Sequence, residues 1–227
     1  YVVLACFAPF ASALMLKIGV RNVVLTAATM NSFGLFLITQ ADHRWHLLLS
    51  VGVLMGAAAG IIGVGLAATV ATRWFVRRRG LVVGVLASAF AAGQLLFVPL
   101  LAWLTTVVDW RYALVIPIIG GFFSALLFLL FSKDWPYDLR LTPLGEKELF
   151  TPPRHDGKNA FVTSLNVLFK SANEPAFWIL ASTFMICGLS STGIVGQHFI
   201  PFCADSNVGI VAASSYLAIM GIFNFIG

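Results

Sequence analysis

Very few side chains that could do chemistry lie within the long apolar runs of this sequence. The polar candidates are His198 and the amides Gln94, Gln197 and Asn224. Histidine changes charge near neutral pH, so His198 could serve as a gate or proton relay, or it could be a structural side chain that faces water at a helix end. Each amide could contact a ligand or join two helices by a hydrogen bond. We take these four residues as candidates for substrate binding or gating.

The sequence contains no pattern typical of an enzyme. Its serine, histidine and carboxylate residues form no nucleophilic arrangement, and it has no Gly-Lys-Ser/Thr loop for binding phosphate. The cysteines Cys6, Cys187 and Cys203 have no metal-ligand spacing, and we interpret them as small core residues. We therefore expect a protein that is not an enzyme and that uses no metal and no cofactor.

The elements that must position the four candidates are expected to be membrane-spanning helices. Of the 227 residues, 59% are apolar and 10% are charged, and the mean hydropathy is +0.94, whereas a soluble domain has about 25% charged residues. Seven apolar runs without Asp, Glu, Lys or Arg cover residues 1–16, 23–41, 47–71, 81–108, 112–131, 177–203 and 208–227. The composition predicts an all-α, polytopic membrane helix bundle. Because both chain ends lie inside apolar runs, we expect the bundle to be incomplete at both ends.

A short basic segment, residues 73–80, is expected to orient these helices. It contains Arg73, Arg77, Arg78 and Arg79 between two apolar runs, and cytoplasmic loops of membrane proteins carry an excess of Lys and Arg. With this segment in the cytoplasm, alternate crossings place twelve of the fourteen Lys and Arg residues on that side. The net charge of +5 therefore belongs to cytoplasmic loops beside the lipid bilayer, and we expect no nucleic-acid partner.

Glycines spaced by four residues predict close packing between helices. Gly52, Gly56 and Gly60 are expected on one face of the 47–71 helix, and Gly84 belongs to a similar stripe in the 81–108 helix. Small residues let helix backbones approach each other in lipid, where no hydrophobic force joins helices. Such stripes indicate a bundle, and they do not indicate an activity.

One long polar connection is expected to divide the chain. Residues 1–132 are predicted to form an N-terminal bundle, and residues 176–227 the start of a second bundle. Between them, residues 133–175 form the connection, whose second half has apolar residues at helical spacing in 159–172. We predict a short helix there that lies on the cytoplasmic membrane surface.

The order of several short motifs resembles the major facilitator superfamily, and within it the monocarboxylate-transporter-like bacterial branch. The motifs are Arg73-Trp74-Phe75 with Arg78-Arg79-Gly80, then Asp109-Trp110-Arg111, and then Trp135-Pro136-Tyr137-Asp138-Leu139. The seven apolar runs would correspond to helices 2–8 of the family's twelve. This resemblance implies a fold of two six-helix halves that rock about a site at the middle of the membrane.

The resemblance also assigns expected roles to individual residues. Lys17, Gly19 and Arg21 match the family's loop between helices 2 and 3, but Leu16 stands where the family has an Asp thought to lock the outward-open state. Asn224 stands where animal monocarboxylate carriers have an Asp, one turn before the Arg that binds the carboxylate. Asn at this position resembles bacterial members.

These observations together predict a secondary active transporter of a small organic anion, a monocarboxylate, that works by alternating access with proton symport or anion exchange. Its expected location is a bacterial inner membrane. Two alternatives stay open, a non-transporting sensor or scaffold with the same fold and a truncated, inactive remnant. The change at Leu16 and the lack of charged residues in the apolar runs allow the first alternative.

Overall fold

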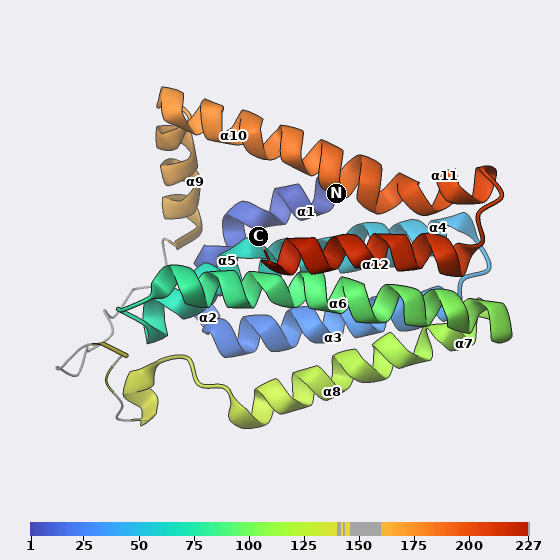
Figure 1. The fold of residues 1–227 in the computed structure, drawn as a ribbon. Helices are drawn as coiled ribbons and strands as arrows, with labels where there is room; N and C mark the ends of the chain where they lie inside the picture. The colour runs from blue at the N-terminus through green and yellow to red at the C-terminus, as the bar shows by residue number, and fades with distance from the viewer. Residues whose placement is uncertain (140–141, 143, 146–159, 227) are drawn as a thin grey trace. The chain divides into compact units, whose positions relative to one another are not determined.

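The computed structural model describes residues 1–139, 142, 144–145 and 160–226, and in these ranges every regular element is a helix (Figure 1). The one pairing of extended backbone in the described ranges is an isolated parallel bridge between Phe75 and Leu144. The predicted all-α fold is therefore confirmed.

The described helices form two compact units. Unit 1 comprises residues 1–85 and 114–166, and unit 2 comprises residues 86–113 and 167–227. These units are groups of packed helices, and the predicted division into residues 1–132, 133–175 and 176–227 stays a prediction.

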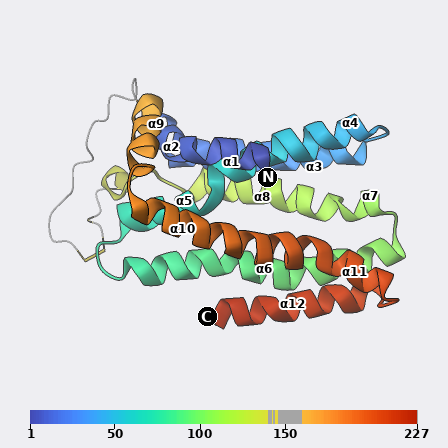
Figure 2. The same cartoon turned by 90° about the horizontal axis from the view of Figure 1, so that it is seen from above.

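Unit 1 contains the first three apolar runs and the fifth. Its elements are α1 (Val2–Phe7), the 3-10 turn η1 (Ala8–Phe10), α2 (Ala11–Ile18), α3 (Val20–Thr39), α4 (Arg44–Leu47), the π-helix η2 (Leu48–Met55), α5 (Gly56–Trp74), the start of α6 (Arg79–Val107), α8 (Val115–Phe131), the 3-10 turn η3 (Pro136–Leu139) and the first half of α9 (Ala160–Ser171). The helix α3 is central, because it packs against α8 and α5 (Figure 2).

Unit 2 contains the rest of α6 and α9 together with the last two apolar runs. Its further elements are α7 (Trp110–Ala113), α10 (Pro175–Cys187), the π-helix η5 (Gly188–His198), α11 (Phe199–Asp205) and α12 (Ile210–Ile226). The elements α10, η5 and α11 run on from one another as a single helical span, Pro175–Asp205.

Five described helices are long and apolar enough to cross a membrane. They are Val20–Thr39, Arg44–Trp74, Arg79–Val107, Trp110–Phe131 and Pro175–Asp205. They confirm five of the seven predicted spans and fit an integral, multi-pass membrane protein. The helices Val2–Ile18 and Ile210–Phe223 are apolar but shorter, so the first and last spans stay predictions.

The local sequence explains where several helices begin. Gly19 separates α2 from α3 and has a φ of 85°, a region of backbone space in which a side chain would be strained. Arg78, with a φ of 63°, makes the corresponding turn before α6. Pro175 occupies the first turn of α10, where the missing N–H costs no helical hydrogen bond.

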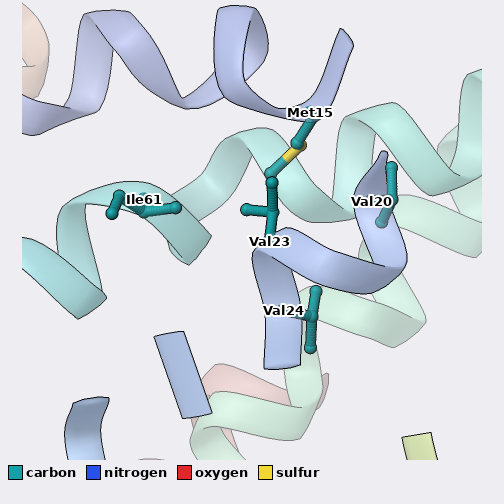
Figure 3. Packing of buried hydrophobic residues seen from close by; sticks show 5 residues of the cluster. All are labelled: Met15, Val20, Val23, Val24 and Ile61. Carbon is teal, nitrogen blue, oxygen red and sulfur yellow. The ribbon is translucent and has the colours of Figure 1, made fainter. Parts of the chain in front are cut away.

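The side-chain core of unit 1 lies where α2, α3 and α5 meet. Met15 of α2 points toward Val23 of α3, and each of the two is 1% exposed (Figure 3). Val20, Val24 and Ile61 complete the buried cluster, with Phe128 of α8 packed against it. This core fixes the end of α2 against the start of α3, immediately beside the turn at Gly19.

Two of the predicted packing glycines contact α1. A Cβ atom at Gly60 would lie 2.6 Å from the backbone oxygen of Leu4, and one at Gly56 would lie 3.4 Å from Cβ of Val3. Around Gly52 and Gly84, the described residues place no heavy atom within 4 Å of the corresponding position. The close approach of α1 to α5 therefore depends on Gly60 in particular.

This difference gives a matched pair of variants. Gly60→Ala should lower the thermal unfolding temperature of the detergent-solubilised protein, because its methyl group meets backbone that cannot rotate away, a steric cost of about 1–3 kcal/mol. Gly52→Ala meets no neighbour and should leave the unfolding temperature equal to or above that of the wild type. Equal unfolding temperatures for the two variants would contradict the Gly60–Leu4 contact.

Candidate functional site

The four candidates for substrate binding or gating all fall in unit 2. Gln94 lies in α6 and is half-buried, and Gln197 and His198 lie at the end of η5 with exposed side chains. Asn224 belongs to α12 by its backbone, and its side chain falls outside the part of the structure that is described. The four positions are thus distributed over three helical segments of one unit.

The helices that carry Gln94 and Asn224 approach each other at a glycine. A Cβ atom at Gly221 of α12 would lie 3.1 Å from the backbone oxygen of Ala91 and 3.6 Å from Cβ of Leu95, both on α6. The two helices run side by side in opposite directions in both views (Figures 1 and 2). Position 224 follows this contact by about one turn, and Gln94 adjoins the contact on α6. The structure therefore brings the backbones that carry these two candidates close together, whereas Gln197 and His198 lie on η5.

Several charged residues that the sequence places in cytoplasmic loops lie together with Gly19 at one end of unit 1. At the centre of this charged cluster is Asp134, three residues after α8. The backbone N–H of Arg21 donates to Oδ1 of Asp134 at 2.8 Å, and the Arg21 guanidinium donates to the backbone oxygen of Leu129 on α8. Oδ2 of Asp134 lies 2.6 Å from where a Cβ atom of Gly19 would be. The turn between α2 and α3 is thus held against the exit of α8.

Arg73 brings the end of α5 to the same place. Its guanidinium lies over the ring of Trp135, 4.4 Å from the ring centre, and a guanidinium nitrogen lies 3.5 Å from the backbone oxygen of Met15. The negative charge of Asp134 also attracts the half-buried Arg73. A cation over the face of a tryptophan ring is favourable, most strongly when water is excluded.

Lys17 connects this end of unit 1 to α9. Its ammonium lies 5.6 Å from the ring centre of Phe161, and the same ring lies 5.9 Å from the ring of Phe10. The helix Ala160–Ser171 matches the helix predicted in residues 159–172. Its predicted place on the membrane surface is not tested by these contacts and stays a prediction.

The arginine-rich segment is held by the connection that follows α8. The backbone N–H of Leu144 donates to the oxygen of Trp74 at 2.9 Å, and the N–H of Val76 donates to the oxygen of Leu144 at 3.1 Å. Arg79 closes the turn, since its Nε donates to the oxygen of Phe75 at 2.7 Å. Gly80 is the last residue of the predicted motif. No described heavy atom lies within 4 Å of where a Cβ atom at this position would be.

Sequence analysis missed Asp134, the residue at the centre of the charged cluster. The one hint in the sequence is its place, directly after an apolar run and beside Trp135. No periodicity relates it to Gly19 or Arg21, because more than a hundred residues separate them along the chain. Within the described residues, no group of three or more His, Cys, Asp or Glu side chains could hold a metal ion.

Comparison with known proteins identifies relatives over the whole chain. A family model described as Major Facilitator Superfamily matches residues 1–227. The protein named Uncharacterized MFS-type transporter YhjX of Escherichia coli (strain K12) is 26% identical over 226 residues, which are 99% of this chain and 52% of that protein.

Animal relatives match about half of the chain. Monocarboxylate transporter 13 of Rattus norvegicus is 33% identical over 108 residues, 48% of this chain and 25% of the transporter. Monocarboxylate transporter 11 of Mus musculus is 34% identical over 108 residues, 48% of this chain and 24% of the transporter. The chain thus spans from about a quarter to about half of the length of these curated relatives. No solved structure matches the chain.

Proposed function

This chain belongs to the Major Facilitator Superfamily, and on that premise we propose that it is part of a secondary active transporter of a small organic anion. The observation that carries the proposal is the identity of about a third with proteins named monocarboxylate transporters over 108 residues. We therefore take a short monocarboxylate as the substrate class. The mechanism would be alternating access, in which two halves of a transporter rock about a site near the middle of the membrane.

The amides of unit 2 supply the chemistry that such a substrate needs. An amide NH₂ group donates two hydrogen bonds, and its oxygen can accept one from a protonated acid. We propose that Gln94 and Asn224 contact the carboxyl group and that Gln197 and His198 line or gate its path. The cost of moving an anion through an apolar environment falls when a proton travels with it, which favours proton symport over anion exchange as the coupling.

Uptake by the reconstituted protein tests the activity. The protein, expressed from its complete coding sequence in proteoliposomes, should accumulate radiolabelled short monocarboxylates several-fold faster with an inward proton gradient than without one. Protein-free liposomes and a protonophore provide the controls. Stimulation by unlabelled carboxylate inside the vesicles, without an effect of the proton gradient, would assign anion exchange. No uptake across a panel of carboxylates would favour a non-transporting sensor or scaffold.

Asn224 can be tested against its neighbour in sequence, Phe223, whose side chain is exposed. Asn224→Ala should raise the KM for the carboxylate by at least about tenfold, since losing a hydrogen bond to a charged group costs about 1.5–3 kcal/mol. Phe223→Leu should leave the KM close to that of the wild type. Both variants should reach the membrane in equal amounts, as measured by immunoblotting. An unchanged KM in Asn224→Ala would contradict substrate binding by Asn224 and would indicate that its amide joins helices.

The proposed orientation places the arginine-rich loops in the cytoplasm of a bacterial cell, in its inner membrane. It is supported by the excess of Lys and Arg on one side and by the Escherichia coli relative that covers nearly the whole chain. In intact cells, a membrane-impermeant maleimide should label a cysteine introduced at Asp42 and should not label one introduced at Arg77. Permeabilised cells should show labelling at both positions. Labelling of position 77 in intact cells would overturn the orientation.

A further inference from the structure

The carboxylate of Asp134 occupies the space that the missing side chain of Gly19 leaves open. A Cβ atom at position 19 would lie 2.6 Å from Oδ2 and 2.9 Å from Cγ of Asp134. At the same time, Oδ1 accepts the backbone N–H of Arg21 at 2.8 Å. Both carboxylate oxygens therefore lie against the turn between α2 and α3, although Asp134 follows α8 in the chain.

The electrostatic surroundings of Asp134 are cationic. Arg21 and Arg73 are both half-buried, and one guanidinium nitrogen of each, Nε of Arg21 and Nη1 of Arg73, is buried without a hydrogen-bond partner. Buried cationic groups are costly unless an anion lies nearby. Asp134 is the anion that attracts Arg73, and it also binds the backbone of Arg21. Removing its charge would leave the half-buried Arg73 without the anion that attracts it.

We propose that Asp134 is a positioning residue that holds the turn between α2 and α3 against the end of α8. We call its contacts with Gly19, Arg21 and Arg73 the pin. Four helix ends meet at this pin. The ends of α2 and α5 are held through Met15 and Arg73, the start of α3 through Arg21, and the end of α8 through Leu129. The pin makes these ends move as one body when the protein changes conformation. This inference rests on the proposed function for its transport readout, whereas the pin itself can be measured without transport.

The expected effect on transport is on the rate and not on substrate affinity. In alternating access, each group of helices must move as a unit. If the turn between α2 and α3 is loose, the helix ends that it joins no longer move together. The proposed substrate contacts, Gln94 and Asn224, belong to unit 2, whereas Asp134 belongs to unit 1. Loss of the pin should therefore reduce the maximal uptake rate several-fold and leave the KM within about twofold, because no substrate contact is removed.

Hydrogen exchange at the Arg21 amide measures the pin directly. In Asp134→Ala, this amide loses its acceptor and should exchange about fivefold faster or more, the size expected for the loss of one hydrogen bond. Asp109→Asn is the matched control, because the carboxylate of Asp109 also accepts one backbone N–H, that of Arg111 at 2.9 Å, but from only two residues away. This control should change neither the exchange at Arg21 nor the uptake rate.

A second variant disturbs the same contact from its other side. Gly19→Ala adds a methyl group where the Asp134 carboxylate lies and strains a backbone with φ of 85°. It should give the same faster exchange at Arg21 and the same loss of rate as Asp134→Ala. The double variant should show little further change, because both substitutions break one contact. Fully additive effects would count against the pin.

Asp134→Asn separates the hydrogen bond from the charge, and Gly19→Ala tests the contact if Asp134→Ala does not fold. In Asp134→Asn, the amide oxygen can still accept the Arg21 N–H, so exchange at Arg21 should stay slow while the uptake rate falls.

The outcomes distinguish the pin from the transport proposal. Unchanged exchange at Arg21 in both Asp134→Ala and Gly19→Ala would overturn the pin, whatever the uptake. Faster exchange with an unchanged uptake rate would overturn its role in transport. If the wild type takes up no carboxylate, the proposed function fails and the exchange experiment alone decides the pin.

Discussion

The packing of unit 1 depends on how closely helix backbones can approach one another. In lipid the hydrophobic effect does not draw helices together, so contact must come from dispersion and from complementary shape. The buried hydrophobic residues of unit 1 fit this constraint, because most of them are alanines, including Ala13, Ala27, Ala57 and Ala58. Where α1 crosses α5, the backbone of Leu4 lies directly over Gly60. Where α3 meets α8, the side chain of Ser32 fills the space beside Gly121. Larger residues at these points would separate the helices.

In the described part of unit 1, the contacts of charged side chains lie at the helix ends, where close packing gives way to loops. Asp134, Arg21 and Arg73 hold four helix ends together, those of α2, α3, α5 and α8. Leu144 binds the backbone of the arginine-rich segment. A carboxylate is effective here because the groups around it are cations and backbone donors, which satisfy its charge. Small residues thus allow the helices to pack closely inside the span, whereas charged residues hold the helices together at its ends.

The apolar runs were sufficient to predict the all-α fold and five of the long helices, since length and hydropathy alone determine whether a helix can span a membrane. The glycine stripe illustrates the limit of this reasoning. Spacing by four residues places Gly52, Gly56 and Gly60 on one face only if the helix is regular, but Gly52 lies in the π-helical segment η2. A π-helix has more residues per turn, so Gly52 does not continue the face that carries Gly56 and Gly60. Asp134 was missed for another reason, because its partners are distant in sequence and are brought to it only by the fold.

The π-helical segment η5 also bears on the candidate site. It ends at Gln197 and His198, and it also contains Ser190, Ser191 and Thr192. Within η5, the Ser190 hydroxyl donates to the backbone oxygens of Ile186 and Cys187. Segments of this kind occur frequently at functional sites, because the wider turn shifts side chains away from the regular helical face. Gln197 and His198 therefore project from a part of the helix whose geometry departs from that of an ordinary membrane span. This irregular backbone supports the proposed role of Gln197 and His198 in binding or gating, which stays a prediction.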